Sequence, residues 1–200
     1  MNYACIDMEG VLIPEMWPFL AKKTGISDFM ITTREVSDYE RLMNYRIKLL
    51  QSNNIKLADV VELLKDLNPL EGAIEFILLL QQNFTVILVS DAFQEMVEKT
   101  WTQLGKPWLE CHSFECDERG YIQKPKYRRT TGKIEVIRAL QGNGVKILSV
   151  GDAFNDLEML RASTRGLLFR PSKETKAAAN GLPVLLSYKQ IMIEAESFQN

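Results

Sequence analysis

Hydrophobic and polar positions follow two alternating patterns along most of the chain. Short apolar runs, typical of buried strands, recur five times. These runs are residues 3–7, 85–89, 146–150, 166–169 and 184–186. Between them, four segments place apolar side chains at three- and four-residue spacing, which predicts amphipathic helices. The helical segments are residues 71–82, 93–104, 131–141 and 154–162. This alternation predicts an α/β fold, a doubly wound and mostly parallel sheet with helices on both faces.

One segment interrupts the alternation. Residues 15–67 contain several helical patterns and no convincing strand, and Pro14 precedes them while Pro69 and Gly72 follow. Proline and glycine often mark the borders of structural units. We therefore predict an all-helical cap over residues 14–69, inserted after the first strand of a core made of residues 1–13 and 70–200. A hairpin over residues 115–123, with its turn at 117–120, is expected to extend one edge of the sheet.

Composition narrows the classes of function. The chain has 200 residues with 46% hydrophobic side chains, enough for one full core. Its net charge of −2 leaves no basic surplus for binding nucleic acid. The most apolar stretch is broken by three polar residues at 81–83, which disfavours a membrane span, and the first residues lack a basic signal-peptide region. With an odd count of three cysteines, we expect a cytoplasmic protein in a reducing compartment.

Polar side chains follow three of the predicted strands. Asp7 follows the first, Ser90 and Asp91 the second, and the run Gly151-Asp152-Ala-Phe-Asn-Asp the third. Ligands bind beyond the carboxyl ends of parallel strands, although a single acid there is also an ordinary helix cap. Two acid clusters at separate strand ends would repel each other unless a cation lay between them, and oxygen ligands suit Mg²⁺. The sequence thus predicts a Mg²⁺ site with Asp7 and Asp152 as ligands and Asn155 or Asp156 on its far side.

Four motifs stand in sequence order: Asp-x-Glu-Gly-Val from Asp7, Ser90 after the second strand, a lysine ahead of the last motif, and Gly-Asp-x-x-Asn-Asp from Gly151. Together they resemble the motifs of the haloacid dehalogenase-like phosphatases. They are spread from residue 7 to residue 156, with the helical insertion between the first two. The resemblance implies the Rossmann-like core of that family, Mg²⁺ as cofactor and an aspartyl-phosphate intermediate.

The resemblance also implies a role for each matching residue. Asp7 would be the nucleophile, and its other oxygen would bind the metal. Glu9 would give a proton to the leaving oxygen and later take one from the acceptor, while its backbone carbonyl would bind the metal. Ser90 would hydrogen-bond the phosphoryl oxygens, Lys133 would neutralise charge, and Asp152 would complete the metal shell.

The motif lysine has three candidates, Lys124, Lys126 and Lys133. We choose Lys133 because it stands early in a predicted helix, from where its side chain can reach the strand ends. Arg128 and Arg129, directly before that helix, are expected to be surface charge, with contact of either one to the substrate as the alternative.

A closer resemblance covers nearly the whole chain. Residues 4–15, 32–34, 69–73 and 151–156, with several positions between 38 and 46, are similar to phosphoserine phosphatases, especially those that transfer the phosphoryl group to homoserine. The resemblance implies that Glu15 meets the substrate ammonium and Arg46 its carboxylate. Asp91 and Asn155 are further predicted substrate-binding residues. Taken alone, Arg46 also fits a solvated helix face and Glu15 a first-turn helix acid.

Glu9 departs from the family, most of which has aspartate at this position. The added methylene moves the proton-handling oxygen by about one bond length, which would favour an alcohol acceptor over water. The serine at position 90 also lacks the glycine pair that follows it in plain phosphoserine phosphatases. The expected reaction is therefore transfer from phosphoserine to water, to homoserine, or to both, with small molecules as the only predicted partners and the oligomeric state left open.

Two alternatives remain. The first is a phosphatase of the same family acting on another small phosphometabolite, such as a sugar phosphate or a nucleotide. The second is a non-enzymatic phospho-receiver domain. A helical insertion directly after Asp7 has no place in a receiver, and the acids at 152 and 156 follow Asp7 instead of preceding it.

Overall fold

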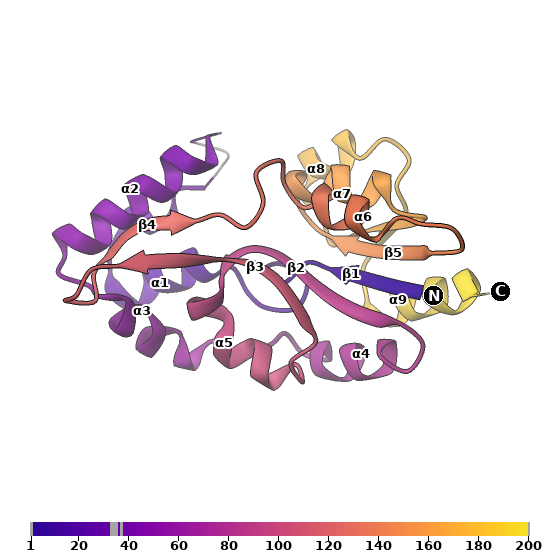
Figure 1. Cartoon of the computed structure of the whole chain (residues 1–200), viewed down its shortest axis with the longest axis horizontal. Helices are drawn as coiled ribbons and strands as arrows, with labels where there is room; N and C mark the ends of the chain where they lie inside the picture. The colour runs from indigo at the N-terminus through magenta and orange to yellow at the C-terminus, as the bar shows by residue number, and fades with distance from the viewer. Residues whose placement is uncertain (1, 33–35, 37, 200) are drawn as a thin grey trace.

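A single seven-stranded sheet organises the chain (Figure 1), as seen in a computed structural model that describes residues 2–32, 36 and 38–199. The strands are β1 (Asn2–Ile6), β2 (Thr85–Phe93), β3 (Trp108–Cys116), β4 (Ile122–Lys126), β5 (Lys146–Gly151), β6 (Arg165–Phe169) and β7 (Val184–Leu185). Their order across the sheet is β4-β3-β2-β1-β5-β6-β7, and β4 alone of these runs antiparallel to its neighbour. The predicted α/β class with a mostly parallel sheet is confirmed.

Helices cover both faces of this sheet. One face carries α4 (Ala73–Leu80), α5 (Gln94–Gln103) and α9 (Tyr188–Gln199), and the other carries α6 (Ile134–Leu140), α7 (Leu157–Ala162) and α8 (Lys173–Ala178) (Figure 1). Successive strand residues point to opposite faces, so a strand buried on both faces must be apolar throughout. In β1, Ala4 and Ile6 pack with the first set of helices while Cys5 packs with the second. The short apolar runs in the sequence reflect this two-sided burial.

Residues 14–69, the predicted cap, hold the helical elements that lie between β1 and α4. These are α1 (Met16–Thr24), η1 (Ser27–Met30), α2 (Tyr39–Ser52), α3 (Leu57–Leu63) and η2 (Leu64–Asp66). Asp38 caps α2 by accepting a hydrogen bond from the Arg41 amide at 3.0 Å. The rings of Trp17 and Phe29 pack at a centroid distance of 5.5 Å, which fixes α1 against η1.

The hairpin of β3 and β4 joins the core to this helical layer. The Gln51 side chain of α2 donates to the Ile122 carbonyl at 2.6 Å, and the Leu57 amide donates to the Gly120 carbonyl at 3.0 Å. Figure 1 shows β4 running beside α2. The expected hairpin is therefore present at the sheet edge, and it also supports the helical segment.

Three features of the fold were not expected from the sequence. Strand β3 begins at Trp108, well before residue 115, and helices α8 and α9 were not predicted. Trp108 is 63% exposed, so β3 lacks the continuous apolar run of the other parallel strands.

Of the stretch 32–34 that contributes to the resemblance, residues 33 and 34 lie outside the described part of the chain. Within that part, every helix is too short or too polar to cross a bilayer.

Candidate active site

Three carboxylates meet where β1 and β5 end. Asp7 directly follows β1, while Asp152 and Asp156 follow β5, which pairs with β1 in parallel through Ile6 and Val150. One oxygen from each of the three carboxylates lies within 4.8 Å of the others. Asp7 and Asp156 are buried, so this negative charge is largely withdrawn from water. Asp156 was anticipated only as an alternative to Asn155, yet it is fully buried in the cluster.

Lys133 supplies the positive charge at this cluster. It stands immediately before α6, and its Nζ lies 2.6 Å from Asp7 Oδ1 and 2.6 Å from Asp156 Oδ1. Burial alone would lower the pKa of Lys133, but the charges of Asp156, Asp7 and Asp91 raise it. The two other candidates, Lys124 and Lys126, are exposed and pair with Glu115.

Negative charge is in excess at the cluster, as expected of a site that binds a cation. Burial raises the pKa of Asp7, and repulsion from Asp156 adds to the effect. Burial and Asp156 likewise raise the pKa of Asp152 to about 7. Asp156 Oδ2 accepts from the Asp152 amide at 2.9 Å and from the Ala153 amide at 3.0 Å, which fixes the loop that carries Asp152. The three carboxylates carry more negative charge than the Lys133 ammonium can neutralise. Their oxygens therefore fit Mg²⁺, with Asp7 and Asp152 as ligands.

Gly10 allows the Asp152 carboxylate to approach the loop after β1. Its φ of +77° is unfavourable for other residues, and a Cβ built there would lie 2.3 Å from Asp152 Oδ2. Any side chain at this position would push Asp152 away from Asp7. Steric contact with Asp152 therefore explains why the Asp-x-Glu-Gly-Val motif requires glycine at this position.

Glu9 links the strand ends to the helical cap. Its Oε1 accepts a hydrogen bond from the amide of Met16, the first residue of α1, at 2.8 Å. Burial and the charge of Glu15 raise the pKa of Glu9 to about 7. A carboxyl group with this pKa can both give and take a proton near neutral pH.

Arg46 lies in the cap and is buried, with 6% of its surface exposed. It donates to the Ile31 carbonyl at 2.8 Å, and its guanidinium stacks on Trp17 at 4.6 Å. Burial lowers the pKa of Arg46, whereas the charges of Glu9 and Glu15 act in the opposite direction. Burial excludes the solvated helix face as an explanation for Arg46. Glu15 itself is exposed, within electrostatic reach of Glu9.

Ser90 and Asp91 lie where the pairing of β2 with β3 becomes irregular, between Val89 and Phe93. Ser90 Oγ accepts from the Ala92 amide at 3.1 Å, and Asp91 Oδ2 accepts from Asn155 Nδ2 at 2.8 Å. Burial alone would raise the pKa of Asp91, but the charge of Lys133 and the hydrogen-bonding neighbours hold it well below its usual range. Ser90, Asp91 and Asn155 thus form one connected group beside Lys133.

The expectation that Arg129 is surface charge was wrong. It is 6% exposed and donates to the Glu110 carbonyl at 2.9 Å, the Ser90 carbonyl at 2.6 Å and Asp91 Oδ1 at 3.0 Å. Arg128 does remain on the surface, paired with the Glu110 carboxylate. Two adjacent arginines give no sequence signal of which one is buried, because residues 127–130 follow no helical or strand period.

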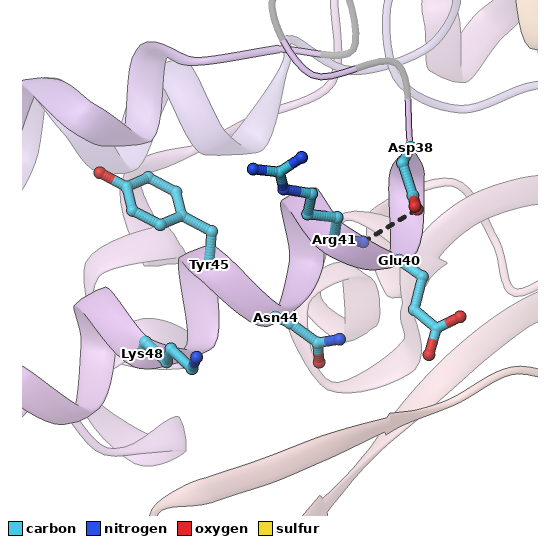
Figure 2. Close-up of a pocket in the computed structure, with 6 residues that line it drawn as sticks. All are labelled: Asp38, Glu40, Arg41, Asn44, Tyr45 and Lys48. Atoms are coloured by element: carbon cyan, nitrogen blue, oxygen red, sulfur yellow. Dashed lines mark hydrogen bonds between the residues drawn. The ribbon is translucent and has the colours of Figure 1, made fainter.

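A separate hollow of about 380 Å³ lies on the exposed side of α2. Its lining residues, shown in Figure 2, are Asp38, Glu40, Arg41, Asn44, Tyr45 and Lys48. None of the six belongs to the carboxylate cluster or to the group around Ser90. The hollow is a feature of the charged cap surface, whereas the chemistry-bearing residues lie at the strand ends.

Comparisons with known proteins agree with this geometry. Residues 1–164 match the family of haloacid dehalogenase-like hydrolases. The chain is 35% identical over 194 residues to phosphoserine phosphatase ThrH of Pseudomonas aeruginosa, covering 97% of this chain and 95% of that protein. It is 39% identical over 169 residues to a phosphoserine phosphatase of Pseudomonas syringae pv. tomato, covering 84% of this chain and 71% of the relative.

A solved structure described as a phospho-aspartyl intermediate analogue of phosphoserine phosphatase superposes with a TM-score of 0.80 at 20% identity, covering 96% of this chain and 97% of that one. A substrate-bound phosphoserine phosphatase complex superposes with a TM-score of 0.78 at 19% identity, covering 97% and 98%. At these identities the structural likeness establishes the fold, which is the predicted one.

Proposed function

The chain belongs to the haloacid dehalogenase-like hydrolase family, and on this premise we propose that it is a Mg²⁺-dependent phosphoserine phosphatase that forms an aspartyl-phosphate on Asp7. The observation that carries the proposal is the contact of Lys133 with both Asp7 and Asp156, at 2.6 Å each, beside Asp152. A buried carboxylate held by a lysine and facing two further acids is arranged to accept a phosphoryl group whose charge must be neutralised.

In the first step, an oxygen of Asp7 forms a bond to phosphorus while the bond from phosphorus to the serine oxygen breaks. Protonated Glu9 gives its proton to that oxygen, so that serine leaves as the neutral alcohol. The hydrogen bond from Met16 to Glu9 Oε1 fixes the carboxyl group, and the pKa of Glu9, raised by burial to about 7, leaves it partly protonated at neutral pH. Lys133 stabilises the negative charge on the transferred group.

In the second step, the ionised Glu9 takes a proton from water, whose oxygen attacks phosphorus. The bond from phosphorus to the Asp7 oxygen breaks, and inorganic phosphate and the free Asp7 carboxylate are released. Ser90 and neighbouring amides would hold the phosphoryl oxygens throughout, because Ser90 directly follows the regularly paired residues of β2, the strand next to β1.

Bound Mg²⁺ would supply charge neutralisation for the phosphoryl oxygens and for the carboxylates around it. Asp7, Asp152 and the backbone carbonyl of Glu9 would hold it, and Asp156 would fix the Asp152 loop through its two amide contacts. Gly10 keeps the Asp152 carboxylate close to the loop after β1.

The cap residues would select phosphoserine. We assign Arg46 to the substrate carboxylate and Glu15 to its ammonium, with Asp91 and Asn155 closing the site. Support comes from the burial of Arg46 and from the charges of Glu9 and Glu15, which lie near enough to oppose the lowering of the Arg46 pKa by burial. A guanidinium fork matches a carboxylate in geometry and charge.

Homoserine as acceptor is a second candidate, favoured by Glu9. The longer side chain, tied to the Met16 amide, alters where the proton is taken from the acceptor. An attacking hydroxyl of homoserine would transfer the phosphoryl group to an alcohol in place of water.

Incubation of the protein with phosphoserine and Mg²⁺, with and without homoserine, separates these outcomes. We expect inorganic phosphate and serine without homoserine; phosphohomoserine in its presence would show the transferase reaction. Absence of both products would overturn the proposed substrate. Turnover of sugar phosphates or nucleotides with unchanged activity of Arg46→Ala would instead favour the other phosphatase hypothesis.

A further inference from the structure

The end of β2 bulges away from its neighbour at the residues proposed to hold the phosphoryl group. Pairing with β3 is regular from Ile87 to Val89, shifts, and resumes only at Phe93. A bulge leaves backbone groups without their ladder partners, and these groups must be satisfied in another way. The Ser90 and Asp91 carbonyls accept from the side chains of Arg129 and Tyr39, while the Ala92 amide donates to Ser90 Oγ within the bulge.

Arg129 spans this irregularity. One guanidinium nitrogen donates to the Glu110 carbonyl of β3 at 2.9 Å, and the other to the Ser90 carbonyl of β2 at 2.6 Å. The second nitrogen also donates to Asp91 Oδ1 at 3.0 Å. A planar fork with fixed donor directions can bridge two strands in this manner, whereas the single ammonium of a lysine cannot reproduce it.

The segment that carries Arg129 is itself fixed. The Arg128 amide donates to His112 Nδ1 at 3.1 Å, and His112 Nε2 lies 3.7 Å from Asp91 Oδ1. His112 is buried and packs edge-on against the ring of Tyr127. Strand β3 thus anchors both the backbone of residues 127–129 and the carboxylate to which Arg129 binds.

The other side of the bulge touches the cap and the loop after β5. The Tyr39 hydroxyl at the start of α2 donates to the Asp91 carbonyl at 2.7 Å, and Asn155 donates to Asp91 Oδ2. Both carboxylate oxygens of Asp91 are therefore engaged within the chain. Arg129 connects the backbones of β2 and β3 to the Asp91 carboxylate.

We propose that Arg129 is a positioning residue for the reaction, which acts by holding the Ser90–Asp91 bulge in the conformation that receives the phosphoryl group. Its hydrogen bonds go to the Glu110 and Ser90 carbonyls and to the Asp91 carboxylate, so it acts through these groups. The inference rests on the proposed function for the identity of the bound group, and it assigns a role to a residue outside the four family motifs.

The test compares Arg129→Met with Arg128→Met, a matched control that removes the same charge from the neighbouring exposed side chain. Inorganic phosphate with Mg²⁺ is the probe, because calorimetry measures its binding whether or not phosphoserine is turned over. We expect the Kd for phosphate to rise about tenfold in Arg129→Met, the usual size for a lost charge-assisted hydrogen bond, and to stay within about twofold in the control. If the substitution only reduced the fraction of folded molecules, the remaining folded molecules would keep the wild-type Kd for phosphate.

Turnover of phosphoserine or, if that substrate fails, of p-nitrophenyl phosphate gives the second measurement. We expect kcat/KM to fall about 100-fold in Arg129→Met, the usual effect of a displaced reacting group. In Arg129→Lys we expect kcat/KM to fall about tenfold. Arg129 lines a groove of about 440 Å³ with Trp108 and Val136, so added guanidinium can reach the vacated position. Millimolar guanidinium should therefore partly restore Arg129→Ala and leave Arg128→Ala unchanged.

Phosphate affinity and kcat/KM within about twofold of the wild type in Arg129→Met would overturn the proposal. So would loss of folding in both Arg129→Met and Arg129→Lys, since the residue would then stabilise the core as a whole. Phosphate binding by a wild type that does not turn over phosphoserine would refute the proposed substrate alone, and the affinities would still decide the role of Arg129.

Discussion

The strand-end cluster and the cap differ in how their charges are held. Lys133 contacts Asp7 and Asp156 at 2.6 Å each, and the parallel pairing of β1 and β5 brings these two acids together. The cap charge of Arg46 is held by a carbonyl and an indole ring, and it interacts with Glu9 electrostatically. This difference suggests that the rigid sheet carries the chemistry common to many substrates, while the helical cap carries selection. The predictions below test that division.

Asp7→Asn should have the largest effect on activity and little cost in stability. We expect kcat to fall by about 10⁴-fold or more because the amide is a poor nucleophile. Since burial and Asp156 raise the pKa of Asp7, replacing its charge with a neutral isostere should leave the free energy of unfolding of the metal-free protein unchanged or higher. Kinetics with phosphoserine and thermal unfolding check the two parts, and retained turnover would contradict the first.

Lys133→Met should lower both the stability of the protein and its catalytic activity. It leaves buried carboxylates without their cation, so we expect a loss of about 3 kcal/mol in the free energy of unfolding and about a 10³-fold loss in kcat. Lys126→Met provides the matched control, because that lysine is exposed and pairs with Glu115. Denaturant titration of both variants would show equal stabilities if Lys133 did not serve the cluster.

Much of the strand-end region could be predicted from the sequence, since an apolar run followed by an acid identifies both a strand and its carboxyl end. The helices described between β1 and α4 were also predictable, because no run in that part of the sequence has a strand pattern. Strand β3 was missed at its start, since Trp108 is exposed and polar residues alternate along the strand. The burial of Arg129 depends on the bulge between β2 and β3, a contact between distant segments that no local pattern encodes.

Arg46→Lys should sharpen the comparison by affecting one substrate only. We expect KM for phosphoserine to rise about 30-fold as the bidentate contact is lost, with kcat less affected. With p-nitrophenyl phosphate, which has no amino-acid carboxylate, kcat/KM should change by less than about threefold. Equal losses for the two substrates would place Arg46 in the common chemistry and remove the proposed division.

The pH dependence of stability, which tests no step of the reaction, should amount to about 5 kcal/mol between pH 5 and about pH 8. The pKa values of Glu9 and Asp152 are raised to about 7 from ordinary values of 4.5 and 3.8. Their neutral forms favour the folded state, so this stability is fully present below about pH 4 and is lost as pH rises through about 7. Denaturant titrations of the metal-free protein from pH 5 to about pH 8 would measure the loss. Saturating Mg²⁺ should reduce it, whereas a gain in stability with rising pH would contradict both raised pKa values.

Covalent phosphorylation of Asp7 is the central claim, and trapping it tests the account most directly. The protein would be mixed with phosphoserine and Mg²⁺, quenched in acid within one turnover, and analysed by peptide mass spectrometry. The account predicts one phosphoryl group on the peptide that contains Asp7, and none in Asp7→Asn. A phosphoryl group on another residue, or rapid turnover with no covalent adduct, would contradict it.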